Sequence, residues 1–229
     1  MRKLIYPHIR RLGHVRRIRR HLPLLLLMLG TLPVMAQDLD YPDFRSKKDN
    51  FNKIRETDIR NDVASFALAA LDESIGKAQL QQIPVKDFGL NFETFQNDNI
   101  LVTIRTGIFS PSKHKLMLSE QHLLRIDGHP YYGGNYGDVP HTTIESVTVV
   151  VGKDTVAIPA IAYNDLFDPK FSYSENGATR SRNGVFLSND KHTFYIYMFN
   201  IDNKGVEYTW VIRDKQYLRR VVDFGFLQQ

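Results

Sequence analysis

The chain has 229 residues, of which 42% are hydrophobic and 24% are charged, and it contains no cysteine. This balance is typical of a globular protein, and the chain is long enough to bury a hydrophobic core without covalent cross-links. The absence of cysteine excludes disulfides, thiolate metal ligands and thiol nucleophiles.

The first 36 residues have the organisation of a secretory signal peptide. Residues 1–21 are rich in arginine and contain no acidic residue, and residues 22–35 form an apolar run. Val34 and Ala36 are small residues at the third and first positions before a cleavage site. The pattern predicts that residues 1–36 are removed by cutting between Ala36 and Gln37.

Other interpretations of this leader stay open, because its basic part is longer than usual. A start codon assigned too early or an arginine-rich transit peptide would give a similar pattern. The apolar run is shorter than the roughly 20 residues that a membrane-spanning helix needs, and it contains Pro23 and Pro33, so cleavage is favoured over an anchor. A bacterial lipid anchor is excluded, because it requires a cysteine.

Export changes the charge of the folded protein. Removal of the leader takes eight of the 30 lysines and arginines and none of the 25 acidic residues, leaving 22 basic residues and a net charge of −3. A nucleic-acid or anionic-membrane partner needs clustered positive charge on the folded domain. We therefore expect no nucleic-acid partner, and no membrane span after cleavage of the signal peptide.

The mature chain is predicted to begin with a polar arm over residues 37–57, followed by a single domain over residues 58–229. A helix is expected over residues 58–72, because apolar residues recur at helical spacing from Ile59 to Ala70. Thr57 or Asp58 would serve as its N-cap.

Strand patterns with turn residues between them follow the helix. Residues 92–95 and 100–105 predict one hairpin, and residues 144–151 and 155–159 predict another. Between them, residues 122–126 read as a strand that runs into a tight turn at Asp127-Gly128.

Two later segments are expected to be irregular. Residues 162–167 are compatible with one helical turn, and residues 174–184 with a polar loop. Counting all apolar runs gives about eight strands.

The strongest strand signal lies near the C-terminus, between Gly184 and Phe226. Three runs rich in aromatic and β-branched residues alternate there with polar turns at residues 188–191 and 200–205. Together the patterns predict an α+β fold that consists mainly of antiparallel β-sheet, sandwich-like or strongly curled, with one helix near the mature N-terminus.

The most distinctive candidate site is a loop rich in glycine and tyrosine over residues 131–138, named here the Gly/Tyr loop. Exposed tyrosine rings would offer a sugar or peptide both apolar area and a hydroxyl group. The alternative is a structural loop whose rings pack onto the sheet. The candidate ligand-binding residues are Tyr131, Tyr132, Asn135, Tyr136, His129 and Asp138.

Catalytic and metal-binding motifs give little support to an enzyme. A metal site formed by His129, Asp138 and His141 is conceivable, but their spacing matches no strong metal motif. The turn at residues 200–205 lacks the length and closing glutamate of a calcium loop. No nucleophile elbow or phosphate-binding loop is present. We therefore assign no catalytic residue and expect no cofactor.

The pair Arg219-Arg220 lies in the last strand pattern. Successive residues of a strand point to opposite faces, so only one of the two arginines is expected to face the core. The simplest explanation is a cross-strand pair with Glu207 or Asp190.

The C-terminal motifs resemble those of exported proteins of unassigned function from Bacteroidetes-type bacteria. The resemblance covers most of the mature chain and is carried by Ile158-Pro159, Tyr195–Met198, Tyr208–Ile212, Asp214 and Tyr217–Phe226. It implies a periplasmic or secreted location and implies no activity.

The leading hypothesis is therefore a non-catalytic binding module of the cell envelope, with a glycan, a peptide or an envelope protein as its partner. Two alternatives are a hydrolase acting on an envelope or extracellular polymer, and an assembly subunit that pairs through an exposed sheet edge.

Overall fold

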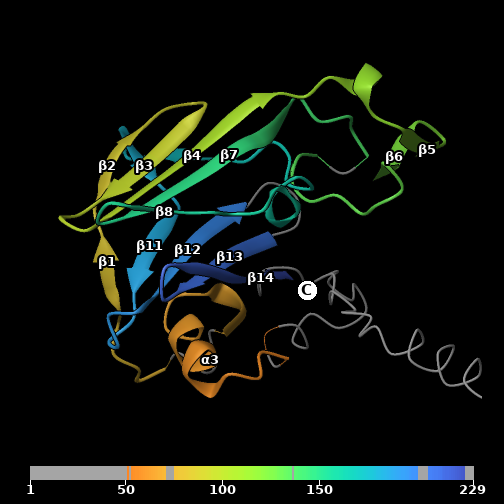
Figure 1. The fold of residues 1–229 in the computed structure, drawn as a ribbon. Helices are drawn as coiled ribbons and strands as arrows, with labels where there is room; N and C mark the ends of the chain where they lie inside the picture. The colour runs from red at the N-terminus through yellow and green to blue at the C-terminus, as the bar shows by residue number, and fades with distance from the viewer. Residues whose placement is uncertain (1–50, 52, 71–74, 136, 201–205, 225–229) are drawn as a thin grey trace, which may run out of the picture. The chain divides into compact units, whose positions relative to one another are not determined.

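Two five-stranded antiparallel sheets dominate the fold of this computed structural model (Figure 1). The structure describes residues 51, 53–70, 75–135, 137–200 and 206–224. The expected signal peptide and most of the expected polar arm therefore lie outside the described residues.

Sheet A contains the C-terminal strands that the sequence predicted. Its order is β1-β11-β12-β13-β14, with all neighbours antiparallel. The strands are β1 (Gln81–Ile83), β11 (Gly184–Leu187), β12 (Thr193–Asn200), β13 (Val206–Arg213) and β14 (Gln216–Phe224).

Sheet B contains the two predicted hairpins. Its order is β2-β3-β4-β7-β8, again antiparallel throughout. The strands are β2 (Val85–Phe88), β3 (Phe92–Gln96), β4 (Ile100–Ile108), β7 (Thr142–Val151) and β8 (Asp154–Val156). Only Pro84 separates β1 of sheet A from β2 of sheet B, so the chain passes from one sheet to the other at a residue that cannot donate to a strand ladder.

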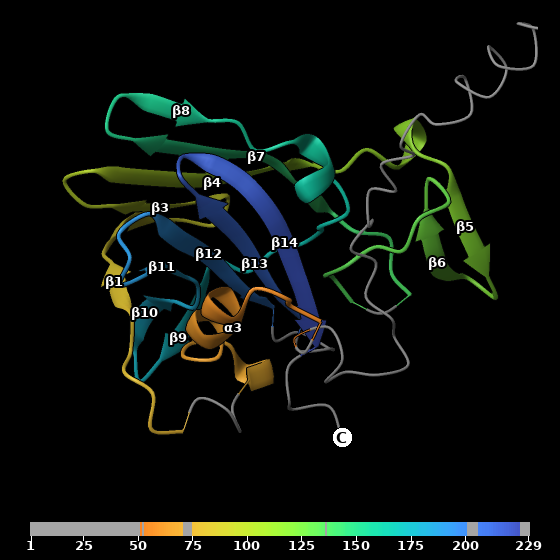
Figure 2. The same cartoon turned by 60° about the horizontal axis from the view of Figure 1, so that its bottom comes forward.

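Two small hairpins accompany the large sheets. One pairs β5 (Leu116–Ser119) with β6 (His122–Ile126), and the other pairs β9 (Ser172–Glu175) with β10 (Ala178–Ser181). In both Figure 1 and Figure 2 the β5–β6 hairpin lies beyond the ends of β4 and β7.

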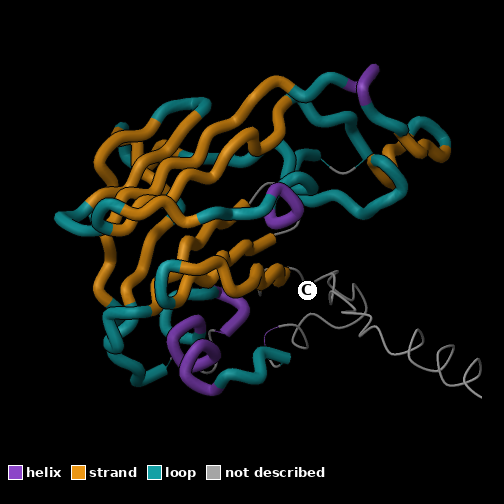
Figure 3. The backbone as a smooth tube through the Cα atoms, viewed as in Figure 1, coloured by secondary structure: helices purple, strands orange, loops and turns teal. Residues whose placement is uncertain are grey.

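Helical structure is a minor part of the described chain, as Figure 3 shows. The α-helix α3 spans Thr57–Val63, and three 3-10 turns span Leu68–Ala70, Pro111–Lys113 and Ala160–Ala162. The predicted fold class, a mainly antiparallel α+β protein with one α-helix near the N-terminal end of the domain, is confirmed within the described residues. No helix of this part of the chain is long and apolar enough to cross a membrane.

The side chains of β12 point alternately into two different cores, and this alternation explains the order of the layers. Phe194, Ile196 and Met198 join the core between the two sheets, whereas Tyr195 and Tyr197 join a second core under α3. Because successive strand residues point to opposite faces, burial of both sets requires sheet A to be covered on both sides. The layers are therefore α3, sheet A and sheet B.

The predicted helix over residues 58–72 is too long. α3 ends at Val63, and the chain continues in turns in which the backbone N–H of Leu68 donates to Glu207 Oε1 at 2.8 Å. A tertiary hydrogen bond thus replaces the continuation of the helix. Glu56, rather than Thr57 or Asp58, occupies the N-cap position, and it makes no side-chain capping bond.

The predicted polar loop over residues 174–184 is also wrong, because it contains most of the β9–β10 hairpin. Its turn is Asn176-Gly177, whose φ angles are 50° and 77°. An Asn-Gly pair is a strong signal for a two-residue hairpin, since both residues tolerate positive φ. The polar composition of the flanking strands concealed it.

Two further expectations need correction. The helical turn expected at residues 162–167 lies earlier, at Ala160–Ala162. The described residues contain fourteen strands in place of about eight, because several are only three or four residues long and give no periodic signal.

Candidate functional site

A surface cleft with a volume of about 430 Å³ lies where four segments meet. These segments are the β2–β3 turn at Gly89 and Leu90, residues 134–135 of the Gly/Tyr loop, residues 141–142 at the start of β7, and residues 168–172. The volume falls within the range of small-ligand pockets. The cleft is therefore the candidate binding site.

Asp168 joins two walls of the cleft. Its Oδ1 accepts hydrogen bonds from the backbone N–H of His141 at 3.0 Å, the backbone N–H of Thr142 at 2.7 Å and the hydroxyl of Thr142 at 2.9 Å. Its φ of 42° places it in the left-handed region, which is uncommon for a residue with a side chain. The hydrogen bonds to His141 and Thr142 stabilise this conformation and fix the position of Asp168 at the start of the 168–172 segment.

Gly134 lets the Gly/Tyr loop approach Asp168 closely. Its φ is +68°, and a Cβ at this position would lie 3.0 Å from Asp168 Oδ2. Both the backbone conformation and the close approach disfavour any side chain. The glycine thus brings Asn135 to the rim of the cleft.

Tyr131 and Tyr132 pack into the protein. Tyr132 is 2% exposed and belongs to the core between the sheets, and its ring lies 6.4 Å from that of Tyr208 in an edge-on arrangement. Tyr131 donates its hydroxyl to Leu123 O at 3.1 Å and packs against Phe167. Tyr132 therefore offers no exposed stacking surface, and the half-buried Tyr131 offers only part of its ring, as the alternative of a structural loop predicts.

The remaining predicted residues separate into two groups. Asn135 is exposed and lines the cleft, as does His141. His129 and Asp138 are exposed but are not among the lining residues. Tyr136 lies outside the described residues.

The residues proposed for a metal site do not form one. The part of the chain that the structure describes contains no group of three histidine, aspartate or glutamate residues arranged to hold a metal ion. His141 approaches Asp168, with 3.8 Å between Nδ1 and Oδ2, but its side chain is 90% exposed. This contact lies at the protein surface and contributes little stability.

Glu93 is a fully buried carboxylate close to residues 170–172 of the cleft lining, named here the 170–172 wall. It lies on β3, and its relative exposure is 0%. Ser181 donates its hydroxyl to Oε1, and Asn183 Nδ2 donates to Oε2 at 2.7 Å. Burial raises the pKa of Glu93 from 4.5 to about 7, although the hydrogen bonds from Ser181 and Asn183 act in the opposite direction.

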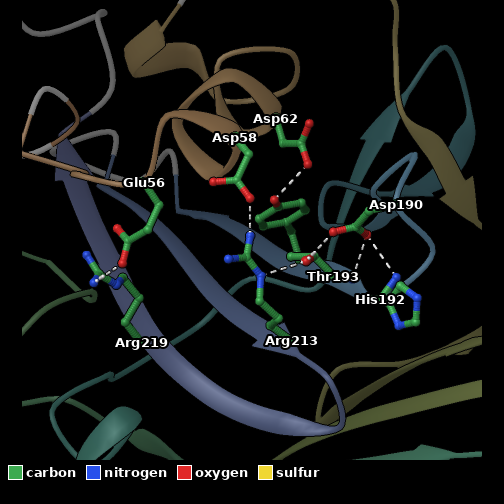
Figure 4. Close-up of polar contacts among 9 residues, drawn as sticks. Glu56, Asp58, Asp62, Asp190, His192, Thr193, Arg213 and Arg219 are labelled. Atoms are coloured by element: carbon green, nitrogen blue, oxygen red, sulfur yellow. Dashed lines mark hydrogen bonds and ion pairs between the residues drawn. The ribbon is translucent and has the colours of Figure 1, made fainter.

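A second polar cluster lies under α3, and Figure 4 shows it. Asp58 pairs with Arg213, and Glu56 accepts from Arg219 Nη2 at 2.7 Å. Tyr195 donates its hydroxyl to Asp62 Oδ2 at 2.8 Å. These contacts all join the helix segment to strands of sheet A, so they explain how α3 docks.

The turn between β11 and β12 extends this cluster. Asp190 accepts from the backbone N–H groups of His192 and Thr193 and from the Thr193 hydroxyl, each at 2.8 Å (Figure 4). Burial opposes ionisation of Asp190, but these hydrogen bonds outweigh it and lower its pKa below 3.8. The carboxylate has a local structural role.

Arg219 and Arg220 point to opposite faces as predicted, but the predicted partners are wrong. Arg220 is buried between the sheets and forms a two-pronged ion pair with Asp165, with 2.8 Å between Nη2 and Oδ2. Arg219 pairs with Glu56. Both partners are distant in sequence and come from segments outside sheet A, so the pattern of the strand could not indicate them.

Comparison with known proteins identified no relative of this chain. No protein-family model matches the chain, and neither curated proteins nor solved structures give a match. The function must therefore be argued from the site.

Sequence reasoning missed most of the cleft. Leu90, Asp168, Lys170 and Ser172 lie in segments that look like ordinary turns and a polar strand. Glu93 had one usable signal, a lone acidic residue in an otherwise half-buried strand pattern. That signal does not say which face of β3 is buried, because Phe92 and Phe95 point to opposite faces.

Proposed function

We propose that the protein is a non-catalytic binding module of the cell envelope and that the cleft holds its ligand. One observation carries the proposal: the cleft combines the polar side chains of Asn135, His141, Lys170 and Ser172 with the apolar side chain of Leu90. A concave site with a few convergent polar groups and an apolar contact is the usual form of a small-ligand site. The 91% exposure of Leu90 leaves its side chain available to a ligand.

A short peptide fits this lining better than a glycan. Recognition of a sugar commonly uses an aromatic face, but Tyr132 and Phe171 are each 2% exposed, and Tyr131 is half-buried and packs against Phe167. Amide, imidazole, ammonium and hydroxyl groups match the donors and acceptors of a peptide backbone. We therefore propose a peptide ligand and treat glycan binding as the competing outcome.

The envelope location is part of the same proposal and has separate support. It rests on the signal-peptide pattern of residues 1–36 and on the resemblance to exported Bacteroidetes-type proteins. A periplasmic or secreted protein would meet peptides of the cell wall and of other envelope proteins. The stem tetrapeptide of peptidoglycan is thus a suitable first probe.

Calorimetric titration tests the cleft with three probes: the stem tetrapeptide, tri-alanine and chitotriose. The variants Asn135→Ala and His141→Ala remove polar groups from the lining. Loss of one ligand hydrogen bond costs about 0.5–1.5 kcal/mol, so each variant should bind the peptide about threefold to tenfold more weakly.

Asn189→Ala and His192→Ala are matched controls, because both residues are exposed and neither lines the cleft. They should bind as the wild type does. Equal weakening by the controls, or unchanged binding in Asn135→Ala and His141→Ala, would place the site elsewhere. If chitotriose binds and neither peptide does, the peptide assignment is wrong.

A further inference from the structure

The two residues that hold Glu93 also hold one wall of the cleft. Asn183 Nδ2 donates both to Glu93 Oε2 at 2.7 Å and to the backbone carbonyl of Lys170 at 3.3 Å. Ser181, which donates to Glu93 Oε1, is the cross-strand partner of Ser172. Lys170 and Ser172 both line the cleft.

Asn183 further ties this group to sheet A, because its Oδ1 accepts from the backbone N–H of Phe199 at 3.0 Å. Glu93 itself belongs to sheet B. The carboxylate thus lies at a junction of both sheets and the 170–172 wall. A change at Glu93 reaches the wall through one side chain, Asn183, and one strand pair, Ser172 with Ser181.

We propose that Glu93 is a positioning residue for the cleft and that its protonation state decides how firmly the 170–172 wall is held. The consequence for a ligand rests on the proposed function of the cleft. The effect of protonation on the 170–172 wall is independent of that proposed function.

The protonated form of Glu93 satisfies every hydrogen bond in the junction. Its O–H can donate to Ser181 Oγ, while the Ser181 hydroxyl donates to the backbone carbonyl of Asn183, 3.2 Å away. The other carboxyl oxygen accepts from Asn183 Nδ2. Protonated Glu93 therefore completes a continuous chain of donors and acceptors.

Ionisation of Glu93 would leave a buried negative charge bound by two neutral side chains, Ser181 and Asn183. Neighbouring elements do carry charged groups, but Arg105 lies over the Phe92 ring, Arg182 lies over the Tyr173 ring, and Arg180 faces Glu175. Asp87 and Lys170 are exposed. The three arginines therefore have other neighbours, and water entry or displacement of Ser181 and Asn183 would accompany ionisation of Glu93.

The direction of the pH effect follows from this arrangement. The pKa of Glu93 is raised to about 7, so the protonated form predominates below neutral pH and the ionised form above it. The wall is therefore held at mildly acidic pH and loosened at mildly alkaline pH.

Backbone hydrogen exchange at residues 170–172 and 178–183 tests this proposal without any ligand. Wild type and Glu93→Gln are compared at about pH 6 and about pH 8, where Glu93 is mostly protonated and mostly ionised. Glutamine is neutral and can make the same hydrogen bonds as the protonated acid. Glu93→Gln should therefore keep the 170–172 wall in place at both pH values. Comparison at equal pH also cancels the intrinsic pH dependence of exchange.

The two proteins should exchange equally at about pH 6. At about pH 8 these amides should exchange at least about fivefold faster in the wild type, as expected for a local opening. Glu145→Gln, an exposed substitution on β7, serves as the matched control and should behave as the wild type does. Equal exchange of wild type and Glu93→Gln at both pH values would overturn the proposal.

Ser181→Ala provides a second variant, so that the test does not depend on Glu93→Gln being well folded. It removes the link from Glu93 to the strand pair that contains Ser172. Exchange at residues 170–172 should rise at about pH 6 and respond less to pH than in the wild type. An unchanged pH response in Ser181→Ala would also contradict the proposal. Neither result depends on whether a peptide binds the cleft.

Discussion

Glu93 shows how much one side chain can set the pH response of a small β-protein. Its carboxyl is fully buried and is held only by neutral donors. The folded protein consequently binds a proton more tightly than the unfolded chain does. This difference makes stability depend on pH over a defined window.

The free energy of unfolding should fall as the pH rises from about 4.5 to about 7. In this window the native state keeps the proton on Glu93, while the unfolded state has lost it. The stabilisation is thus fully present below the unfolded pKa of 4.5 and is lost as the pH passes the folded pKa of about 7. Its size is on the order of 3 kcal/mol.

Urea denaturation at about pH 5 and about pH 8 measures this change. Glu93→Gln should lose most of the pH dependence, because glutamine stays neutral in both states. Glu145→Gln should keep it, since Glu145 is exposed. The same loss of stability with pH in wild type and Glu93→Gln would assign the effect to other groups.

The β5–β6 hairpin is packed against the protein on one face and exposed on the other. Its inward side packs against Phe109 and Phe167 through Leu123 and Ile126. Its outward side exposes Met117, Leu118 and Leu124. Leu118 and Leu123 face each other across the two strands but have opposite environments, with 53% and 1% exposure.

Two truncations in this hairpin should therefore have unequal effects. Leu123→Ala removes a fully buried side chain and should lower the free energy of unfolding by about 2–5 kcal/mol. Leu118→Ala should change the free energy of unfolding by no more than about 0.5 kcal/mol, because the Leu118 side chain is exposed and makes few packing contacts that truncation would remove. Urea denaturation of both variants at one pH gives the comparison. Similar losses would mean that the outward face of the hairpin is covered in solution.

The helix α3 depends on its sheet rather than on its own sequence. It is seven residues long, too short to be stable alone, and its N-cap makes no side-chain bond. Apolar contacts of Ile59 and Val63, with the ion pairs shown in Figure 4, fix it to sheet A. Helical periodicity identified the element, and tertiary contacts decided its length.

At the scale of the molecule, the two sheets share one core. Phe95, Val102 and Ile104 of sheet B pack with Ile196 and Trp210 of sheet A. Trp210 is 0% exposed, and its indole N–H donates to Ala162 O at 2.8 Å. It is the only tryptophan of the chain, so its fluorescence reports on this shared core.

Unfolding of the two sheets should consequently be a single cooperative transition. The urea midpoint measured by Trp210 fluorescence, which reports on the shared core, should coincide with the midpoint measured by far-UV circular dichroism, which reports on all strands. Removing either sheet would expose the apolar face of the other, so neither is expected to persist alone. Separate midpoints would show that one sheet unfolds before the other.

Local patterns were sufficient to predict the antiparallel fold class, the helix near the start and the hairpins around residues 92–105, 144–156 and 193–212. Strand periodicity and turn residues depend only on residues close together in the chain, so the sequence alone reveals them. The same applies to the leader pattern of residues 1–36, which remains a prediction about export. Asn176-Gly177 belongs with these local signals, although it was overlooked.

The site was decided by tertiary structure. The burial of Tyr132, the meeting of Asn135 with residues 168–172, and the partners of Arg220 and Glu93 all depend on segments that are far apart in sequence. No local pattern indicates which face of a strand is covered or which distant loop lies over it. Charge, burial and protonation at Glu93 depend on those distant neighbours, and only the packed arrangement of the two sheets supplies them.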